Sequence, residues 1–366
     1  MKRITLVVLF AILLVSAPQY SLLNSTTKSV ERTSTGSSTF VFDSFESFNS
    51  TDETVVMALD SQMGEMVGCA QFEGSIQNTN FGGAQQMTSN GGDDILLFGW
   101  NLSLGYWSIQ VGGQGDETCQ KVRWTSPTTF GFVGSFRDEI TIGGQTYVSH
   151  GESDAIAGFY DVSSQQWTNV LTIGTPSNDV MWSFIPLTNG THTFVGSSGG
   201  NLTEYTNISG SQDCTPSGSS TTTQCMFILN ADASLNPTTM MTLLSTGSVM
   251  GRDIIEIGTS GKTMVTGYFN RELQINPPIN SQNNGNDLFI LRMSPELERK
   301  YLTTFGGNGS DWGLTIAPIP SGFAVSGMSE STALSRAQTR YPSTSTWTAP
   351  IGQGEEDGVV LKTSVN

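Results

Sequence analysis

Phe130-Gly-Phe-Val-Gly-Ser-Phe136 is the stretch of sequence that decides the fold, because apolar residues surround a glycine in a strand-like segment. The same pattern returns four more times along the chain. The five segments are 66–72, 130–136, 192–198, 264–269 and 323–328, aligned on Gly68, Gly134, Gly196, Gly267 and Gly327. Intervals of 66, 62, 71 and 60 residues between these glycines predict a repeat architecture.

Two acidic markers accompany the glycine strands. The first opens the apolar run at the end of a unit, at Asp94, Asp154, Asp287 and Asp357, with Gln224 in the corresponding place of the third unit. The second closes a glycine-rich turn before the glycine strand, at Asp116, Asp179, Asp253 and Asp311. In the first unit only Asp52-Glu-Thr54 remains of that turn. Short apolar runs between regular turns predict an all-β fold.

The markers divide residues 39–366 into five units of about four short strands each. The approximate bounds are 39–101, 102–161, 162–230, 231–293 and 294–366. Four-stranded units repeated around an axis are typical of a β-propeller, so we predict five blades. We expect the strand glycines to permit close backbone approach near the crowded axis. A pair of β-sandwiches or a β-solenoid is the competing architecture.

Composition and charge exclude two classes of protein. Only 13% of the 366 residues are charged, 41 are glycine, and 32 acidic against 16 basic residues give a net charge of −16. A coiled coil or helical bundle needs Ala, Glu, Lys and Leu at helical spacing, which this chain lacks. An acidic surface repels phosphate groups, so nucleic acid is excluded as a partner.

The N-terminus reads as a targeting segment followed by a tether. Lys2 and Arg3 precede an apolar run, and Val15-Ser16-Ala17 is a small-residue cleavage pattern, so residues 1–17 are predicted to be a secretory signal peptide. Its removal would change the net charge from −16 to −18. Residues 18–38 are rich in Ser and Thr and predict a flexible or glycosylated tether.

A secreted or cell-surface location follows from the signal peptide, and an uncleaved N-terminal anchor is the alternative. No later segment is apolar enough for a membrane span. Asn-x-Ser/Thr sites fit a secreted glycoprotein, although Asn, Ser and Thr are so common here that some sites arise by chance. They begin at Asn24, Asn49, Asn101, Asn189, Asn201, Asn207 and Asn308.

Four cysteines suggest disulfides in an oxidising compartment. Cys214 and Cys225 bracket a loop rich in Ser, Thr and Gly, and we predict that they pair. Cys69 and Cys119 lie in neighbouring units, so a bridge between adjacent blades is a second expectation.

The unit resembles a bacterial and archaeal β-propeller repeat family, often called the seven-bladed propeller repeat. The second unit carries the resemblance with Gly112-Gly113, Gly115-Asp116, Val133-Gly-Ser-Phe136 and 151–161. The fourth unit matches through 265–269 and 285–291. The first unit lacks the glycine turn, and the third has an insertion and no matching aspartate. The resemblance covers roughly residues 39–366; it implies a propeller on an extracellular or surface protein and leaves the activity open.

Few residues suggest catalysis. His150 and His192 stand at turns without the third group that a nucleophile–base pair requires, so each is interpreted as a solvated turn histidine. The cysteines lack the spacing of a zinc site. We interpret the recurring aspartates as caps of backbone N–H groups in turns, because each recurs once per unit. Calcium coordination by these carboxylates is the alternative, and otherwise no cofactor is expected.

Aromatic residues offer a carbohydrate contact. Trp107 and Trp167 hold equivalent strand positions, which favours packing between blades. Tyr341 and Trp347 fall in the irregular stretch 329–353 and are the candidate ligand-binding residues.

The sequence favours a secreted or cell-surface binding module without enzymatic activity, acting on an extracellular glycan, surface polymer or protein. The alternative is a carbohydrate-active hydrolase or lyase on the same scaffold. Such an enzyme needs two carboxyl groups about 5–10 Å apart in one pocket, and pairs adjacent in sequence such as Asp93-Asp94 point to opposite faces of a strand. A purely structural envelope component is a third reading.

Overall fold

The computed structural model describes residues 49–62, 64–78, 85–101, 105–202, 214, 224–320, 322–338, 349–350 and 357–364. The described chain is built of antiparallel strands, with a short 3-10 turn, η1 (Gln282–Asn284). The all-β class predicted from the short strands is confirmed. The predicted signal peptide 1–17 and tether 18–38 lie outside the described residues.

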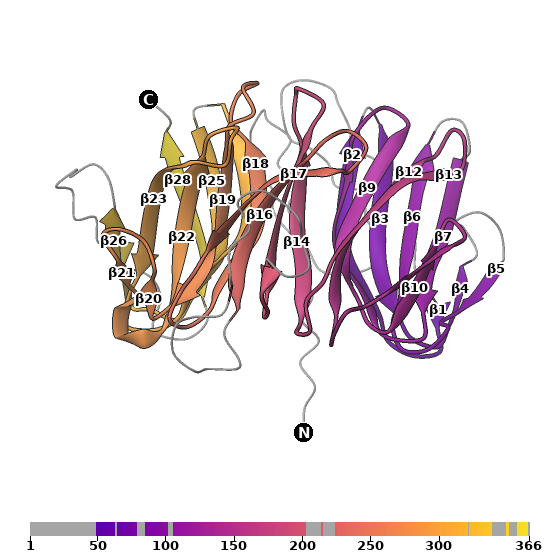
Figure 1. Cartoon of the computed structure of the whole chain (residues 1–366), viewed down its shortest axis with the longest axis horizontal. Coiled ribbons are helices and arrows are strands. Elements are labelled where there is room, and N and C mark those ends of the chain that lie inside the picture. Colours follow the sequence, from indigo (N-terminus) through magenta and orange to yellow (C-terminus); the bar gives the residue numbers. More distant parts are fainter. Residues whose placement is uncertain are drawn as a thin grey trace, which may run out of the picture. The chain divides into compact units, whose positions relative to one another are not determined.

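The longer strands form five antiparallel sheets that follow one another along the chain (Figure 1). The first contains β2 (Thr54–Gln62), β3 (Glu65–Phe72), β6 (Asp94–Asn101) and β7 (Gly105–Gly113). The second contains β8 (Glu117–Trp124), β9 (Thr129–Phe136), β12 (Asp154–Asp161) and β13 (Gln166–Ile173). The third contains β14 (Asp179–Pro186), β15 (His192–Ser198), β16 (Cys225–Ala231) and β17 (Pro237–Leu243).

The fourth sheet contains β18 (Val249–Glu256), β19 (Thr263–Asn270), β22 (Asn286–Met293) and β23 (Arg299–Gly306). The fifth contains β24 (Asp311–Ile319), β25 (Gly322–Ser329) and β28 (Asp357–Ser364), three strands in all. In each sheet the chain moves outward from one strand to its antiparallel neighbour. The predicted plan of about four strands therefore holds for the first four sheets, and the fifth shows three described strands.

Short hairpins occupy most of the segments between the second and third strands of a sheet. They are formed by β1 (Asn49–Ser50), β4 (Ser75–Asn78), β5 (Gln85–Thr88), β10 (Glu139–Ile142), β11 (Gln145–Val148), β20 (Glu272–Leu273), β21 (Ile279–Asn280), β26 (Ala333–Gln338) and β27 (Ala349–Pro350). Strand β10 belongs to the second sheet by sequence, yet it pairs with β7 of the first. Strand β26 likewise pairs with β23 of the preceding sheet. In the second and fifth sheets, the segment between the second and third strands thus pairs with the outer strand of the sheet before it.

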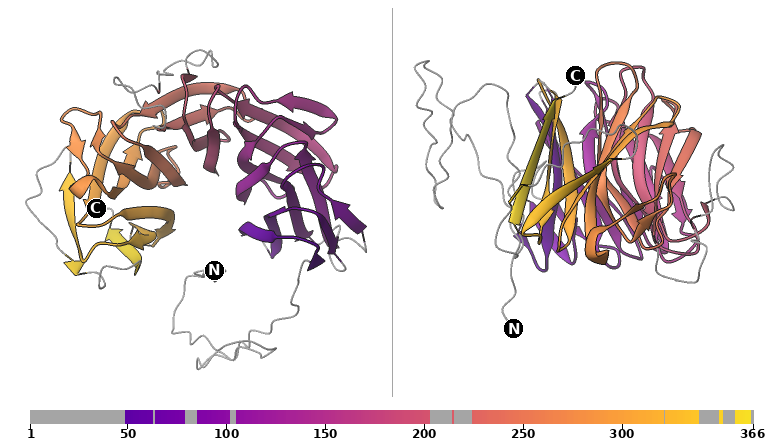
Figure 2. Two further views of the ribbon diagram at one scale, coloured as in Figure 1. Left: turned by 90° about the horizontal axis from the view of Figure 1, so that it is seen from below. Right: turned by 90° about the vertical axis from the view of Figure 1, so that its left-hand side faces the viewer.

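Apolar cores lie between consecutive sheets, and the first strands of neighbouring sheets contact one another. Contacts join β2 to β8, β8 to β14, β14 to β18 and β18 to β24. The core between the first two sheets includes Val67 and Leu97 on one side and Phe132 and Ile156 on the other. In Figure 2 the sheets stand face to face in sequence order, which explains why alternate positions on both faces of the inner sheets are apolar.

The sheets and the predicted repeat units are offset by one strand. The predicted unit 102–161 starts with β7, which is the last strand of the first sheet, and the unit 162–230 likewise starts with β13. A repeat pattern has the same period wherever it is cut. Sequence spacing therefore cannot show whether a strand pairs with the strand before it or the strand after it.

A β-bulge in the first strand of every sheet explains the recurring glycines. In the second sheet Gln120 is the extra residue, and Gly134 pairs with Cys119 just before it. A Cβ atom at Gly134 would lie 1.7 Å from the carbonyl oxygen of Thr118. The corresponding distances at Gly267 and Gly327 are 1.9 Å to the carbonyl oxygens of the facing strands. The carbonyl group before the bulge lies very close to the adjacent strand, so the residue that faces it on that strand is a glycine, which has no side chain.

The first sheet departs from this alignment. Its bulge follows Val56, which pairs with Ala70, so Ala70 holds the position of Gly134 and its equivalents. Gly68 lies two residues earlier, where a Cβ would meet the rings and methyls of Phe98 and Leu59. Matching Gly68 with the other four glycines is therefore wrong by two residues.

Two disulfides are present, as expected from the cysteine positions. Cys69 on β3 joins Cys119 on β8, which links the first and second sheets. Cys214 joins Cys225 at the start of β16. Disulfides persist in oxidising compartments, which is consistent with secretion. Among the described residues, no helix has the length and apolar character to cross a membrane.

Candidate functional site

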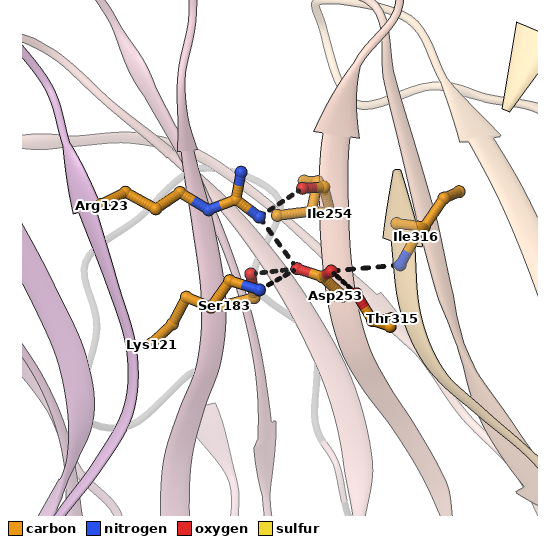
Figure 3. Close-up of polar contacts among 7 residues, drawn as sticks. All are labelled: Lys121, Arg123, Ser183, Asp253, Ile254, Thr315 and Ile316. Carbon is orange, nitrogen blue, oxygen red and sulfur yellow. Dashed lines mark hydrogen bonds and ion pairs between the residues drawn. The ribbon is translucent and has the colours of Figure 1, made fainter. Parts of the chain in front are cut away.

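The residues that follow the bulges bring the first strands together through polar side chains. These residues are Ala58, Lys121, Ser183, Asp253 and Thr315, one from each sheet. Four of the five are polar, and they meet at Asp253, as Figure 3 shows. Each bulge turns its strand at the same level, so equivalent side chains from separate sheets reach one point.

Asp253 accepts hydrogen bonds from the first strands of three other sheets, the second, the third and the fifth. Its Oδ1 lies 3.3 Å from Lys121 Nζ, 3.0 Å from Arg123 Nη2 and 2.7 Å from Ser183 Oγ. Its Oδ2 accepts from Thr315 Oγ1 at 2.7 Å and from the Ile316 backbone N–H at 3.1 Å. We call Lys121, Arg123, Ser183, Asp253 and Thr315 the Asp253 cluster. It ties β8, β14, β18 and β24 together.

The electrostatics of the cluster keep Asp253 ionised. Burial alone would raise its pKa, but Lys121, Arg123 and the two hydroxyl donors outweigh that effect and hold the pKa well below its usual range. Burial lowers the pKa of Lys121, and the charge of Asp253 opposes the shift. Both carboxylate oxygens are already engaged and the side chain is 2% exposed. Such a group binds the scaffold together and has no free lone pair to offer a substrate.

Arg252, the bulge residue beside Asp253, forms a different contact. Its guanidinium stacks over Trp182, the bulge residue of β14, with the Cζ atom 3.8 Å from the ring centroid. Trp182 Nε1 donates to Ser197 Oγ at 2.9 Å, which fixes the indole. Tyr268, paired with Met250 on β18, donates its hydroxyl to Met250 Sδ at 2.8 Å. Arg252, Trp182 and Tyr268 are all half-buried.

The first group of predicted turn carboxylates lies at the start of the third strands. Asp94 accepts from the backbone N–H of Asn90 and from Gln110 Nε2 at 2.6 Å. Asp154 accepts from the backbone N–H of His150 at 3.0 Å, and Asp287 from that of Gln282 at 3.2 Å. These contacts have the geometry of caps on the preceding turns. Asp357 also begins its strand, β28, whereas in the third sheet Cys225 holds this register position, one residue after Gln224.

The second group separates in the structure. Asp179 accepts from the Thr175 backbone N–H at 2.6 Å, and Asp311 accepts from Ser331 Oγ at 2.8 Å, each at the start of a first strand. Asp116 is exposed and lies 3.5 Å from Arg137, while its neighbour Glu117 takes the equivalent buried position. Asp253 is four residues into β18, so it belongs to the cluster and not to a turn.

Several of these carboxyl groups are buried without a compensating cation. Burial raises the pKa of Glu117 to about 8, aided by the charges of Asp94, Asp116 and Asp138 and opposed by a bond from the Gly113 N–H. Burial also raises the pKa of Asp287 to about 7 and that of Asp179 to about 6. In both, bonds from backbone N–H groups oppose the rise. These groups bind protons more tightly than ordinary carboxyls do.

The two histidines differ in environment. His150 is exposed, and its Nδ1 lies 2.8 Å from Asp154 Oδ2. The interpretation of His192 as a solvated turn histidine is wrong, because its side chain is buried at the start of β15 in an edge contact with Phe159, and burial lowers its pKa to about 4. Within the described ranges, no group of three or more His, Cys, Asp and Glu side chains is arranged to hold a metal ion.

Of the predicted aromatic residues, Trp107 stacks on Phe130 and Trp167 meets Phe132 edge-on, both within the core between the first and second sheets. Tyr341 and Trp347 lie outside the described residues. Lys121, Arg123, Arg252 and Trp182 define none of the motifs that the sequence repeats. The signal that could have identified these cations is their place in the middle of strands, in a chain with few charged residues.

Comparison with models of known protein families finds no match, and comparison with curated proteins finds none either.

Proposed function

We propose that the protein is a secreted or cell-surface β-propeller of five blades that binds an extracellular glycan without turning it over. The five sheets, their adjacent first strands and the bulge repeated in each support the propeller arrangement. The repeat resemblance of residues 39–366 points the same way.

The observation that carries the binding function is the contrast between constant strands and variable connections. The strands repeat in length and register, whereas the segment between the second and third strands differs in length from sheet to sheet. It spans 73–93, 137–153, 199–224, 271–285 and 330–356. A rigid scaffold that carries variable loops is the usual arrangement of binding proteins, because loops can change without disturbing the core.

The buried carboxyls favour binding over hydrolysis. Asp94, Glu117, Asp154 and Asp179 have no exposed surface. A general acid or nucleophile must reach within hydrogen-bond distance of its substrate, and a side chain with no exposed surface does not. The raised pKa of Glu117 is therefore the consequence of burial beside other carboxylates and gives no reason to assign it a catalytic role.

The test is a binding screen combined with product analysis. Purified mature protein is presented to immobilised glycans, surface polymers and extracellular proteins, and soluble glycans from the same samples are analysed by chromatography after prolonged incubation. Binding to glycans with unchanged chain length supports the proposal. Shortened or unsaturated products would establish the hydrolase or lyase instead, and binding to proteins alone would overturn the glycan assignment.

A further inference from the structure

Arg252 is a half-buried cation whose charge the surrounding strands leave unneutralised. Its guanidinium stacks on Trp182 with the Cζ atom 3.8 Å from the ring centroid, and among the described residues no carboxylate lies within ion-pair distance of it. The adjacent Asp253 is engaged by Lys121, Arg123 and two hydroxyl groups. Five N–H donors on Arg252 therefore face no acceptor of their own.

The middle of the first strands also carries a positive excess. Away from the strand ends these strands hold Lys121, Arg123 and Arg252 against Asp60 and Asp253. Asp60 accepts the backbone N–H of Trp124 at 2.8 Å. This local excess of one positive charge contrasts with the net charge of −16 of the whole sequence. Because Arg252 is half-buried and has no protein counter-ion among the described residues, its guanidinium is available to an anion from solution.

The neighbours of Arg252 indicate what kind of anion would fit. Trp182, on which the guanidinium stacks, is held by its bond to Ser197. Tyr268, which interacts electrostatically with Arg252, is held by its bond to Met250. Stacking on the indole orients the guanidinium plane and leaves its edge to form two parallel bonds with one carboxylate. Aromatic faces beside such a fork suit a sugar ring that carries its own carboxyl group.

We propose that Arg252, stacked on Trp182 and flanked by Tyr268, binds the carboxylate of a uronic acid residue in an acidic glycan. This inference rests on the proposed glycan-binding function and names its ligand class. Arg252 supplies charge and bidentate geometry. Trp182 holds the guanidinium in its binding orientation.

The experiment measures affinity by titration calorimetry for oligogalacturonate and for its methyl ester, which has the same ring and no charge. The variants are Arg252→Gln, Arg252→Lys and the control Lys262→Gln, which removes a cation from an exposed turn. We expect the native protein to bind the free acid at least tenfold more tightly than the ester. Arg252→Gln should lose at least tenfold for the acid, Arg252→Lys should lose less, and Lys262→Gln should stay within twofold.

Thermal unfolding of the ligand-free variants separates a binding role from a structural one. Arg252→Gln should unfold at the same temperature as the native protein or higher, because it removes an uncompensated cation. An Arg252→Gln protein that is strongly destabilised or unfolded would show a structural role and overturn the inference. Equal affinity for acid and ester, or tighter binding of polyglutamate than of oligogalacturonate, would also overturn it. If neutral glycans bind with an affinity that does not depend on Arg252, the inference is wrong and the proposed function is still supported. If no glycan binds at all, both are wrong.

Discussion

Single residues in this protein are explained by the bulges next to them. Gly134, Gly196, Gly267 and Gly327 each face the carbonyl that precedes a bulge on the neighbouring strand, and the residue after that bulge points to the common polar cluster. In the second to fifth sheets, one irregularity thus fixes both a glycine and a polar side chain, whereas in the first sheet Ala70 and Ala58 hold these positions.

Gly134→Ala should destabilise the protein by roughly 1–3 kcal/mol, the usual cost of inserting a methyl group into a filled space. Its Cβ would lie 1.7 Å from the Thr118 carbonyl oxygen, so backbone must move. Gly358→Ala is the matched control, because a Cβ there meets nothing within 4 Å. Urea unfolding measures both, and equal free energies of unfolding for the two variants would contradict the role assigned to the bulge.

Asp253→Asn should lower the free energy of unfolding by about 3–5 kcal/mol, because Lys121 and Arg123 would lose their shared counter-charge. The control is Asp116→Asn, which breaks the exposed contact with Arg137 and should cost under about 1 kcal/mol. Denaturant titration of both variants at pH 7 checks the difference. A loss at Asp253 no larger than that at Asp116 would show that the cluster does not hold the first strands together.

At the scale of elements, three kinds of contact join consecutive sheets. Apolar faces meet between sheets, hairpins such as β10–β11 extend the outer strand of the previous sheet, and in one place a disulfide joins β3 to β8. The disulfide closes a sequence separation of 50 residues, against 11 for Cys214 and Cys225. The longer loop restricts the unfolded chain more.

Removal of the longer disulfide in Cys69→Ala/Cys119→Ala should reduce stability by roughly 4 kcal/mol on the chain-entropy relation. Removal of the shorter one in Cys214→Ala/Cys225→Ala should cost less, about 3 kcal/mol on the same relation. Scanning calorimetry of the two double variants gives the comparison. If the second variant melts at the lower temperature, the order of the two contributions is reversed and loop length does not govern them.

Turn carboxylates that cap backbone N–H groups do not require a metal ion. Asp94, Asp154 and Asp287 are already bonded to the N–H groups of Asn90, His150 and Gln282. We therefore expect that EDTA leaves the melting temperature within about a degree, since these bonds persist without calcium. A fall of many degrees on chelation, restored by added Ca²⁺, would favour the calcium alternative.

At the scale of the whole molecule, the stability of the part that the structure describes depends on pH mainly through three buried carboxyl groups with raised pKa values. Glu117, Asp287 and Asp179 have pKa values of about 8, 7 and 6, all above their values in an unfolded chain. The folded state binds these protons more tightly, so their contribution is fully present below about pH 4 and is lost as pH rises through the folded values. The pKa of His192 is lowered to about 4, so its contribution has the opposite sign: it increases the stability of the folded state as pH rises from 4 to 6.5.

Because three carboxyls oppose one histidine, the melting temperature should fall as pH rises from about 5 to 8.5. Glu117→Gln removes the group with the highest shifted pKa and should flatten the upper part of that profile, between about pH 6.5 and 8.5. Melting curves of the native protein and this variant across the range test the sign. A native protein that becomes more stable throughout this range would contradict it.

The sequence by itself determined the all-β class, the repeat of strands and turns, and the Cys214–Cys225 pairing, because each rests on local patterns of apolar residues, glycine and cysteine. The structure decided that Cys69 and Cys119, which lie in neighbouring units, also pair. The sequence could not determine which strands share a sheet, since a periodic pattern looks the same wherever it is cut. It also placed Gly68 and Asp253 in positions that the strand register does not support. Only the tertiary structure brought Lys121, Ser183, Asp253 and Thr315 together and set Arg252 on Trp182, because these contacts depend on bulges that align strands 60 or more residues apart in sequence.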